Sequence, residues 1–204
     1  MSNLKKRMQF TSFIRNAKSA DTVKAAKTWK EHFAQIRLAD LKFLDPEYIV
    51  IIQDRMNETE RCCVASAPMA TMVLCGSVLE GILLNCAKKY PSKFSPDLFS
   101  ECDMNIDLRK KWNTVQLIDA AYNVGLLNED GRKLSKELMG HRNHIHVEKQ
   151  ADNDFTPTQT LSEICLLRLC EAITCMKNSD FNQNLTNENQ TFNLEIQNNQ
   201  TNPA

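Results

Sequence analysis

One apolar segment constrains the fold of this chain more than any other feature. Residues 66–89, SAPMATMVLCGSVLEGILLNCAKK, place apolar side chains on nearly every side of a helical projection, and a helix of that kind has to be buried on all sides. Ser66 is suited to cap such a helix, Pro68 fits its first turn, and the following YPSKFSP ends it. We therefore predict a central buried helix with other helices packed around it.

Polar residues within this segment distinguish it from a membrane span. Its most apolar part, residues 73–87, contains Glu80 and Asn85 and is shorter than the roughly 20 apolar residues that a bilayer requires. Residues 1–10 carry basic charges with no apolar run behind them, unlike a secretion signal. We expect no membrane association and a cytoplasmic location.

Composition narrows the classes of partner and cofactor. Lys plus Arg equals Asp plus Glu, at 25 each, so a polyanion would have to bind through a local patch. The eight cysteines form no Cys-x-x-Cys pair, and His141, His144 and His146 have no cysteine neighbour at zinc-finger spacing. We predict reduced thiols, no metal site and no cofactor.

Apolar residues spaced three and four apart predict further helices, and the five glycines and few alternating runs argue against a sheet. Pro46 suits the first position of one helix, Gly125 the end of another, and Thr156 with Pro157 the start of the last. The expected segments are residues 21–39, 46–62, 114–124, one that begins near Asn128 and carries residues 137–149, and 156–178. Residues 91–111 are expected to form a connecting loop with short turns.

The domain organisation follows from this helix pattern and from one shift in composition. Residues 1–178 are expected to form a single domain, with N-terminal helices over 1–63 and a bundle over 64–177. Residues 179–204 are rich in Asn and Gln and offer few side chains to bury, so burial cannot offset the entropy lost on ordering. We predict an all-α bundle of about five to six helices followed by a disordered tail.

The stretch ELMGHRNHIHVEK, residues 137–149, concentrates side chains that suit phosphate chemistry. In a continuous helix, Arg142 and His146 lie one turn apart on a common face with Asn143 beside them. An arginine binds a phosphate through paired hydrogen bonds, and a histidine exchanges a proton near neutral pH. The spacing is therefore compatible with binding and cleaving a phosphodiester. A structural alternative is that Arg142 and His146 only satisfy carbonyls at the end of their helix.

Three further side chains support this candidate site. A carboxylate in an apolar helix is costly unless it is paired, so Glu80 is expected either to pair with Arg142 or a motif histidine, or to face a solvated groove. His141 is expected to help the arginine bind a phosphate, and His144 to contact RNA or water. Gly140, inside the same helix, is expected either to let a second helix approach closely, as a dimer interface through this helix would use, or to be only a weak point that bends the helix.

A second, weaker candidate is the basic run Arg109, Lys110 and Lys111 beside Trp112. These cations would hold a nucleic-acid backbone while the indole stacks on a base. The alternative is a cluster of charges at a helix start with Trp112 buried in the core.

The segment LSKELMGHRNHIHVEK, preceded by TVQLIDAAYNVGLLNEDGR and SVLEGILLNCAKKY, resembles the HEPN superfamily. The likeness is greatest to bacterial members with an RNxIH signature at a helix end, and it covers about residues 64–177. It implies a bundle of four or five helices that often forms a homodimer and brings two motifs together. It also implies a toxin-like role in bacterial stress or defence, with an antitoxin or another operon-encoded partner.

In active members of that superfamily, the motif arginine and histidine form a metal-independent ribonuclease site. By position these residues are Arg142, Asn143 and His146, which would cleave RNA, including tRNA, by attack of a ribose 2′-hydroxyl on the adjacent phosphorus. Catalytic members usually have about four to six residues between the arginine and the histidine. Only three residues separate Arg142 from His146, which turns the imidazole by about 100° around the helix relative to a four-residue spacing. The alternative is a non-catalytic HEPN-like module that binds nucleotide, RNA or a protein partner.

Overall fold

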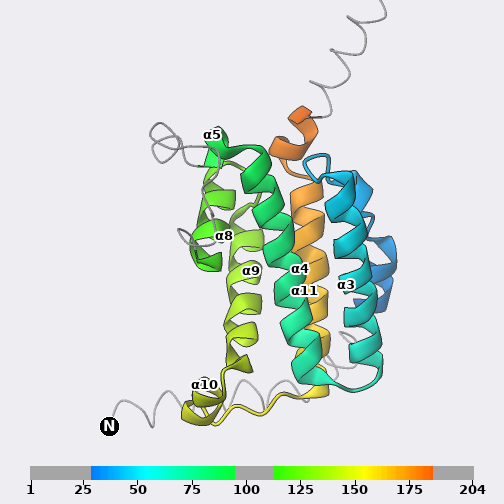
Figure 1. Cartoon of the computed structure of the whole chain (residues 1–204), viewed down its shortest axis with the longest axis vertical. Helices are drawn as coiled ribbons and strands as arrows, with labels where there is room; N and C mark the ends of the chain where they lie inside the picture. Colours follow the sequence, from blue (N-terminus) through cyan, green and yellow to red (C-terminus); the bar gives the residue numbers. More distant parts are fainter. Residues whose placement is uncertain (1–28, 95–112, 186–204) are drawn as a thin grey trace, which may run out of the picture.

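The computed structural model describes residues 29–94 and 113–185, and all regular structure within these ranges is helical (Figure 1). The prediction of an all-α bundle is confirmed. The elements in chain order are a helix over 29–35, η1 (Leu38–Asp40), α3 (Pro46–Val64), α4 (Pro68–Lys89), α5 (Pro91–Phe94), α8 (Thr114–Asn123), α9 (Glu129–Arg142), η2 (Asn143–Ile145), α10 (Val147–Asp152), α11 (Gln159–Lys177) and a helix over 180–185. Arg109, Lys110, Lys111 and Trp112 lie outside the described residues.

The apolar segment forms the central helix α4, as predicted. Figure 1 shows α4 between α3 and α9, and it contacts α3, α8, α9 and α11. By length and composition α4 is long and apolar enough to cross a membrane. However, 61% of its most apolar 18-residue stretch is buried within the bundle. Its buried residues are Thr71, Met72, Cys75, Gly76, Val78, Leu79, Ile82, Leu83, Leu84, Asn85, Cys86 and Ala87. The face that carries Val73, Ser77 and Glu80 is partly exposed, so burial on all sides is not complete.

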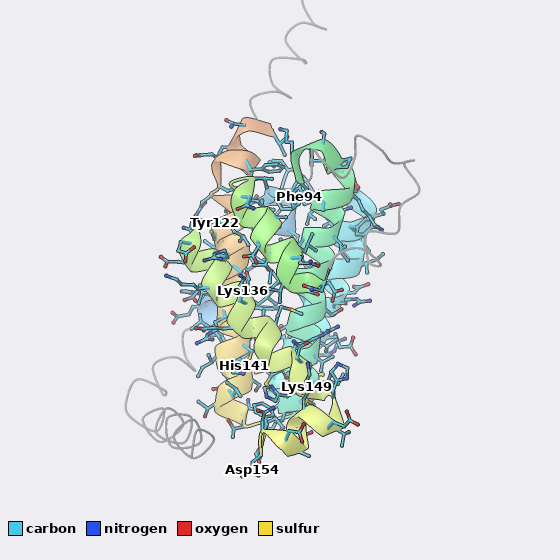
Figure 2. The ribbon with its side chains drawn as sticks, turned by 90° about the vertical axis from the view of Figure 1, so that its left-hand side faces the viewer. Phe94, Tyr122, Lys136, His141, Lys149 and Asp154 are labelled. Atoms are coloured by element: carbon cyan, nitrogen blue, oxygen red, sulfur yellow. The ribbon has the colours of Figure 1, made fainter. Side chains whose placement is uncertain are left out.

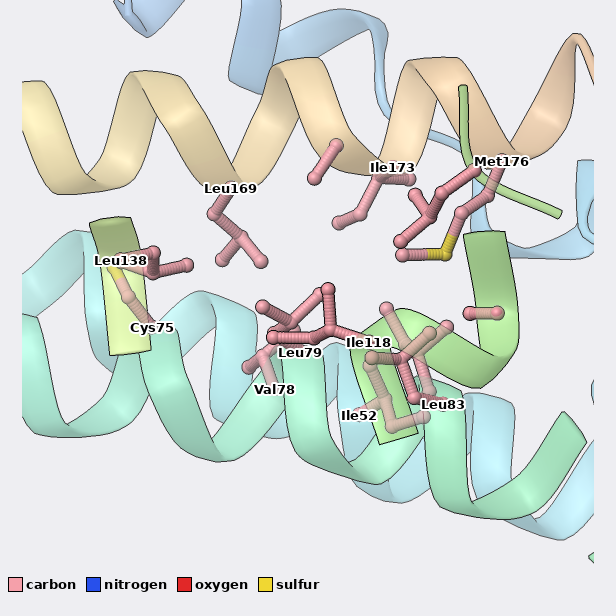
Figure 3. Packing of buried hydrophobic residues seen from close by; sticks show 14 of the residues in the cluster. Ile52, Cys75, Val78, Leu79, Leu83, Ile118, Leu138, Leu169, Ile173 and Met176 are labelled. Carbon is pink, nitrogen blue, oxygen red and sulfur yellow. The ribbon is translucent and has the colours of Figure 1, made fainter. Parts of the chain in front are cut away.

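The core surrounds α4 and includes buried side chains from α3, α8, α9 and α11, and Figure 3 shows part of it. There Val78 and Leu79 of α4 face Leu169 and Ile173 of α11. The cysteines among the described residues are free thiols, and most of them are buried. Burial raises the pKa of the Cys165 thiol to about 12. These cysteines therefore serve as small apolar core residues.

Several predicted helix ends are confirmed by the local geometry. Pro46 occupies the first turn of α3, and Gly125 follows α8 with a φ of 76°, a backbone conformation that glycine adopts without strain. The side chain of Asn128 accepts a hydrogen bond from the N–H of Gly131 at 2.8 Å and so caps α9.

Two predicted caps are wrong by one or two residues. Ala67, not Ser66, is the N-cap of α4, and Ser66 instead has a φ of 57° in the tight turn after α3. At the start of α11 the hydroxyl of Thr158 accepts from the N–H of Leu161, whereas the sequence pointed to Thr156. Thr156 and Thr158 have the same capping side chain, so sequence alone could not choose between them. Ala67 has no capping side chain and forms no side-chain cap hydrogen bond, so the start of α4 carries no such signal.

Asn85 connects α4 to the start of α3. Its Oδ1 accepts a hydrogen bond from the N–H of Asp45 at 3.1 Å, and its Nδ2 donates to Oδ2 of Asp45 at 3.0 Å. Lys89 forms an ion pair with the same carboxylate at 2.8 Å, and these contacts hold the pKa of Asp45 below its usual value. The polar interruption of the apolar segment is therefore a structural contact.

The prediction that disorder begins at residue 179 is wrong for residues 179–185. Residues 180–185 are helical, and Phe181 is buried with its ring edge-on to Phe43, Tyr90 and Phe94. Asn182 is also buried and bonds to the backbone around η1. A few well-placed side chains outweigh the polar composition, and residues 186–204 lie outside the described part of the chain.

Candidate functional site

The motif lies where α9 ends. Arg142 is the last residue of α9, Asn143 begins η2, and His146 has an extended backbone with φ of −76° and ψ of 117° before α10 starts. The prediction that Arg142 and His146 share one helical face is therefore wrong. The ring of His144 stacks on Phe155 at 3.9 Å between centroids, and this tertiary contact accompanies the turn away from the α9 axis.

Arg142 lies across α4 and points toward Glu80. Its Nη2 is 3.5 Å from Oε2 of Glu80, and each side chain is about one third exposed, at 32% and 30%. The pairing between these two residues that the sequence suggested is present. It is a long, partly hydrated ion pair, so its contribution to stability is small.

Gly76 makes this arrangement possible. A Cβ atom at position 76 would lie 2.6 Å from Cγ of Arg142 and 2.9 Å from its Cβ, closer than side chains can approach. A glycine inside a helix costs about 1 kcal/mol relative to alanine, and here the absent side chain leaves room for the arginine stem. Gly140 is exposed, and a Cβ there would meet nothing within 4 Å in the described chain. Close approaches in the described chain are instead found at Gly76 and at Gly131, where a Cβ would lie 2.8 Å from Sγ of Cys175.

Arg142, Asn143 and Glu80 line a cleft of about 630 Å³ formed by α4, the start of α8 and the end of α9. The complete lining is Glu80, Leu84, Asn113, Thr114, Val115, Gln116, Leu117, Met139, Arg142 and Asn143. It combines one cation, one carboxylate, amides and an aliphatic wall. His141, His144 and His146 are not among these residues, so the cleft joins the arginine and asparagine of the motif without its histidines.

The start of α8 was missed as part of the site. Asn113 and Gln116 form a capping box, in which each side chain bonds to the backbone of the other at 2.9–3.0 Å. The spacing of these two residues is a local helix-start signature, but sequence alone could not show that this helix start faces Arg142. Gly76, one turn before Glu80, was also missed.

His141 and His144 have structural surroundings. Figure 2 shows His141 near the end of α9, and burial lowers the pKa of its imidazole to about 4, with Arg168 and His144 nearby as further causes. His141 is therefore neutral near pH 7 and adds no positive charge for a phosphate. Arg168 pairs with Glu137 of α9. His146, by contrast, is exposed.

No cluster of three or more His, Cys, Asp or Glu side chains suited to a metal occurs in residues 29–94 and 113–185. The fold and the site define an all-α bundle with an arginine–glutamate pair at the wall of a polar cleft. No family model, curated protein or solved structure matches the chain. Membership of the HEPN superfamily therefore remains an interpretation of the motif and of the helix order.

Proposed function

We propose that this chain binds RNA through its phosphate backbone in the cleft beside Arg142 and Asn143. The observation that supports this most is the placement of Arg142, whose stem is packed against α4 while its head reaches the cleft wall. A preorganised guanidinium binds a phosphate through two parallel hydrogen bonds and loses little side-chain entropy on binding. The resemblance to the HEPN superfamily is what favours RNA over other phosphate ligands.

Glu80 has a defined part in this proposal. Without a ligand it is the partner of Arg142 at 3.5 Å, long enough for the pair to be only loosely held. An incoming phosphate would take over the forked face of the guanidinium, while packing of the stem against α4 at Gly76 would keep it aligned. The carboxylate also repels phosphate, so Glu80 is expected to limit affinity.

The second candidate is a metal-independent endoribonuclease, a toxin-like component of bacterial stress or defence. The observation that favours it is the exposure of His146, which follows Arg142 by four residues and lies in an extended backbone. In this mechanism His146 moves a proton during attack of the ribose 2′-hydroxyl, and Arg142 stabilises the charged phosphorane. Because His146 does not line the cleft, it would have to come from a second copy in a homodimer or from rearrangement of residues 143–147.

One experiment separates the two candidates. The purified chain is mixed with a short fluorescein-labelled single-stranded RNA and, separately, with total RNA and tRNA in excess EDTA, beside Arg142→Ala and His146→Ala. Binding is expected to weaken by about tenfold in Arg142→Ala and to persist in His146→Ala.

The chemical groups at the ends of any RNA fragments then show whether the chain cleaves RNA by this mechanism. Products that carry 2′,3′-cyclic phosphate, formed by the wild type and absent with either variant, support the nuclease. Binding with intact RNA supports the binding module. Neither binding nor cleavage by the wild type rejects both candidates.

A further inference from the structure

We infer that Gly76 is a positioning residue for Arg142, because its bare backbone is the surface along which the arginine stem is directed to Glu80 and to the cleft. The consequence for RNA rests on the proposed function. The consequence for the placement of Arg142 does not.

Three successive carbons of the arginine lie against this one position. A Cβ at Gly76 would be 2.9 Å from Cβ, 2.6 Å from Cγ and 3.4 Å from Cδ of Arg142. The contact therefore follows the stem and does not involve only its flexible end. A methyl group at position 76 requires the stem to leave the surface of α4 or the two helices to separate.

The surroundings decide which of the two moves. More than half of the residues of α4 are buried, and the helix contacts α3, α8, α9 and α11, so its displacement would disturb the core. Arg142 is the final residue of α9, and its side chain is 32% exposed, so open space is available to it. Rotation of the side chain moves Cγ and Cδ but leaves Cβ, 2.9 Å from the added methyl group, in place. The last turn of α9 is therefore expected to shift together with the arginine side chain.

Glu80 sets the direction in which the stem runs. It lies one helical turn beyond Gly76 on the same face of α4, about 6 Å along the helix axis. Its carboxylate lies 3.5 Å from Nη2 of Arg142. Gly76 thus supplies the space along which the stem runs, and Glu80 is the group toward which the guanidinium points.

Gly81 provides a matched control on the same helix. A Cβ at position 81 would meet only Cγ1 and Cδ1 of Ile52, at 3.8 and 4.0 Å, which is ordinary van der Waals contact. Gly81→Ala therefore adds the same methyl group to α4 without touching Arg142.

The test observes the arginine directly in the full ¹⁵N-labelled chain. The Nε–Hε signal of Arg142 is assigned by its loss in Arg142→Lys and followed by NMR well below the melting temperature. It is expected to shift in Gly76→Ala and to stay in place in Gly81→Ala. Affinity for the labelled single-stranded RNA is expected to fall in Gly76→Ala by about as much as in Arg142→Ala.

An unchanged Arg142 signal in folded Gly76→Ala overturns the inference. If Gly76→Ala does not fold, the double variant Gly76→Ala with Arg142→Gly is measured: recovery of the melting temperature of Arg142→Gly supports the clash, and failure to recover it overturns the inference. Wild-type protein without RNA affinity, combined with a shifted Arg142 signal in Gly76→Ala, rejects the proposed function and retains the positioning role.

Discussion

The two ends of this helical bundle are built differently. At one end, α5 and the helix over 180–185 enclose the ring of Phe181 among three other aromatic rings. At the other end, η2 and α10 expose Ile145, His146 and Val147, and Val147 is 78% exposed. Figure 1 shows α5 and α10 at opposite ends, and Figure 2 shows the same separation between Phe94 and Asp154.

This contrast between the two ends implies that one end contributes mainly to stability and the other to the proposed RNA binding. The aromatic end buries apolar rings and satisfies the amide of Asn182 with backbone partners. The motif end leaves the Arg142–Glu80 pair partly hydrated and lets the chain depart from helix after Arg142. Substitutions at the aromatic end should therefore change unfolding more than RNA affinity, and those at the motif end should do the reverse.

The largest effect on unfolding is expected from Phe181→Ala. Removing a buried ring leaves a cavity among Phe43, Tyr90 and Phe94 and should lower the free energy of unfolding by about 3 kcal/mol. Urea denaturation measures this, with Val147→Ala at the exposed end as the control, expected to change it by no more than about 0.5 kcal/mol. Similar losses in the two variants would contradict the contrast between the ends.

A smaller effect is expected from pH through His141. The pKa of its imidazole is lowered to about 4 in the folded chain from the usual 6.5, so the unfolded state binds more protons between these values. The contribution of neutral His141 to the free energy of unfolding is fully present above about pH 6.5 and is lost as the pH decreases toward 4, by at most about 3 kcal/mol. Acidic groups contribute to the same range, so the measurement is the difference between wild type and His141→Gln. Parallel pH profiles for the two proteins would show that His141 does not contribute.

Asn182→Ala should lower stability by about 1–2 kcal/mol. Its side chain accepts from the N–H of Lys42 at 2.7 Å and donates to the carbonyls of Asp40 and Lys177 at 2.9 Å. Chemical denaturation is the measurement, and the same protein below its transition should bind the labelled RNA as the wild type does. If folded Asn182→Ala loses RNA affinity, RNA binding depends on the aromatic end as well, which would contradict the contrast between the two ends.

The smallest effect on unfolding is expected from Glu80→Gln, which should change stability by less than about 1 kcal/mol because the pair is partly exposed. RNA affinity should rise by about threefold, because a carboxylate that competes with phosphate is replaced by a neutral amide of the same shape. Fluorescence anisotropy at low salt measures this change. A fall in affinity would mean that the charge of Glu80 is needed to hold Arg142 in place.

Local patterns predicted much of the fold because their causes are local. The apolar surface of α4, the proline that opens α3 and the glycine after α8 act through neighbouring residues of the same segment. The ordered helix over 180–185 was missed because its burial depends on Phe43 and Tyr90, which are distant in sequence.

The same reasoning explains what was found and missed at the site. The cost of burying a carboxylate predicted that Glu80 needs a partner, and Arg142 is that partner. The turn at His146 and the role of Gly76 depend on contacts between separate helices. The periodicity of one helix carries no information about such contacts.

Asn85 has a consequence for the uniqueness of the fold. Apolar contacts are non-directional, so α3 and α4 would pack almost as well if they were displaced by one turn. The two hydrogen bonds between Asn85 and Asp45, one donated by the N–H of Asp45 and one by the amide of Asn85, form in one alignment of these helices and are broken in the others. The amide of Asn85, together with the hydrogen bond that Arg55 of α3 donates to Ser77 of α4, therefore selects the register in which α3 and α4 meet.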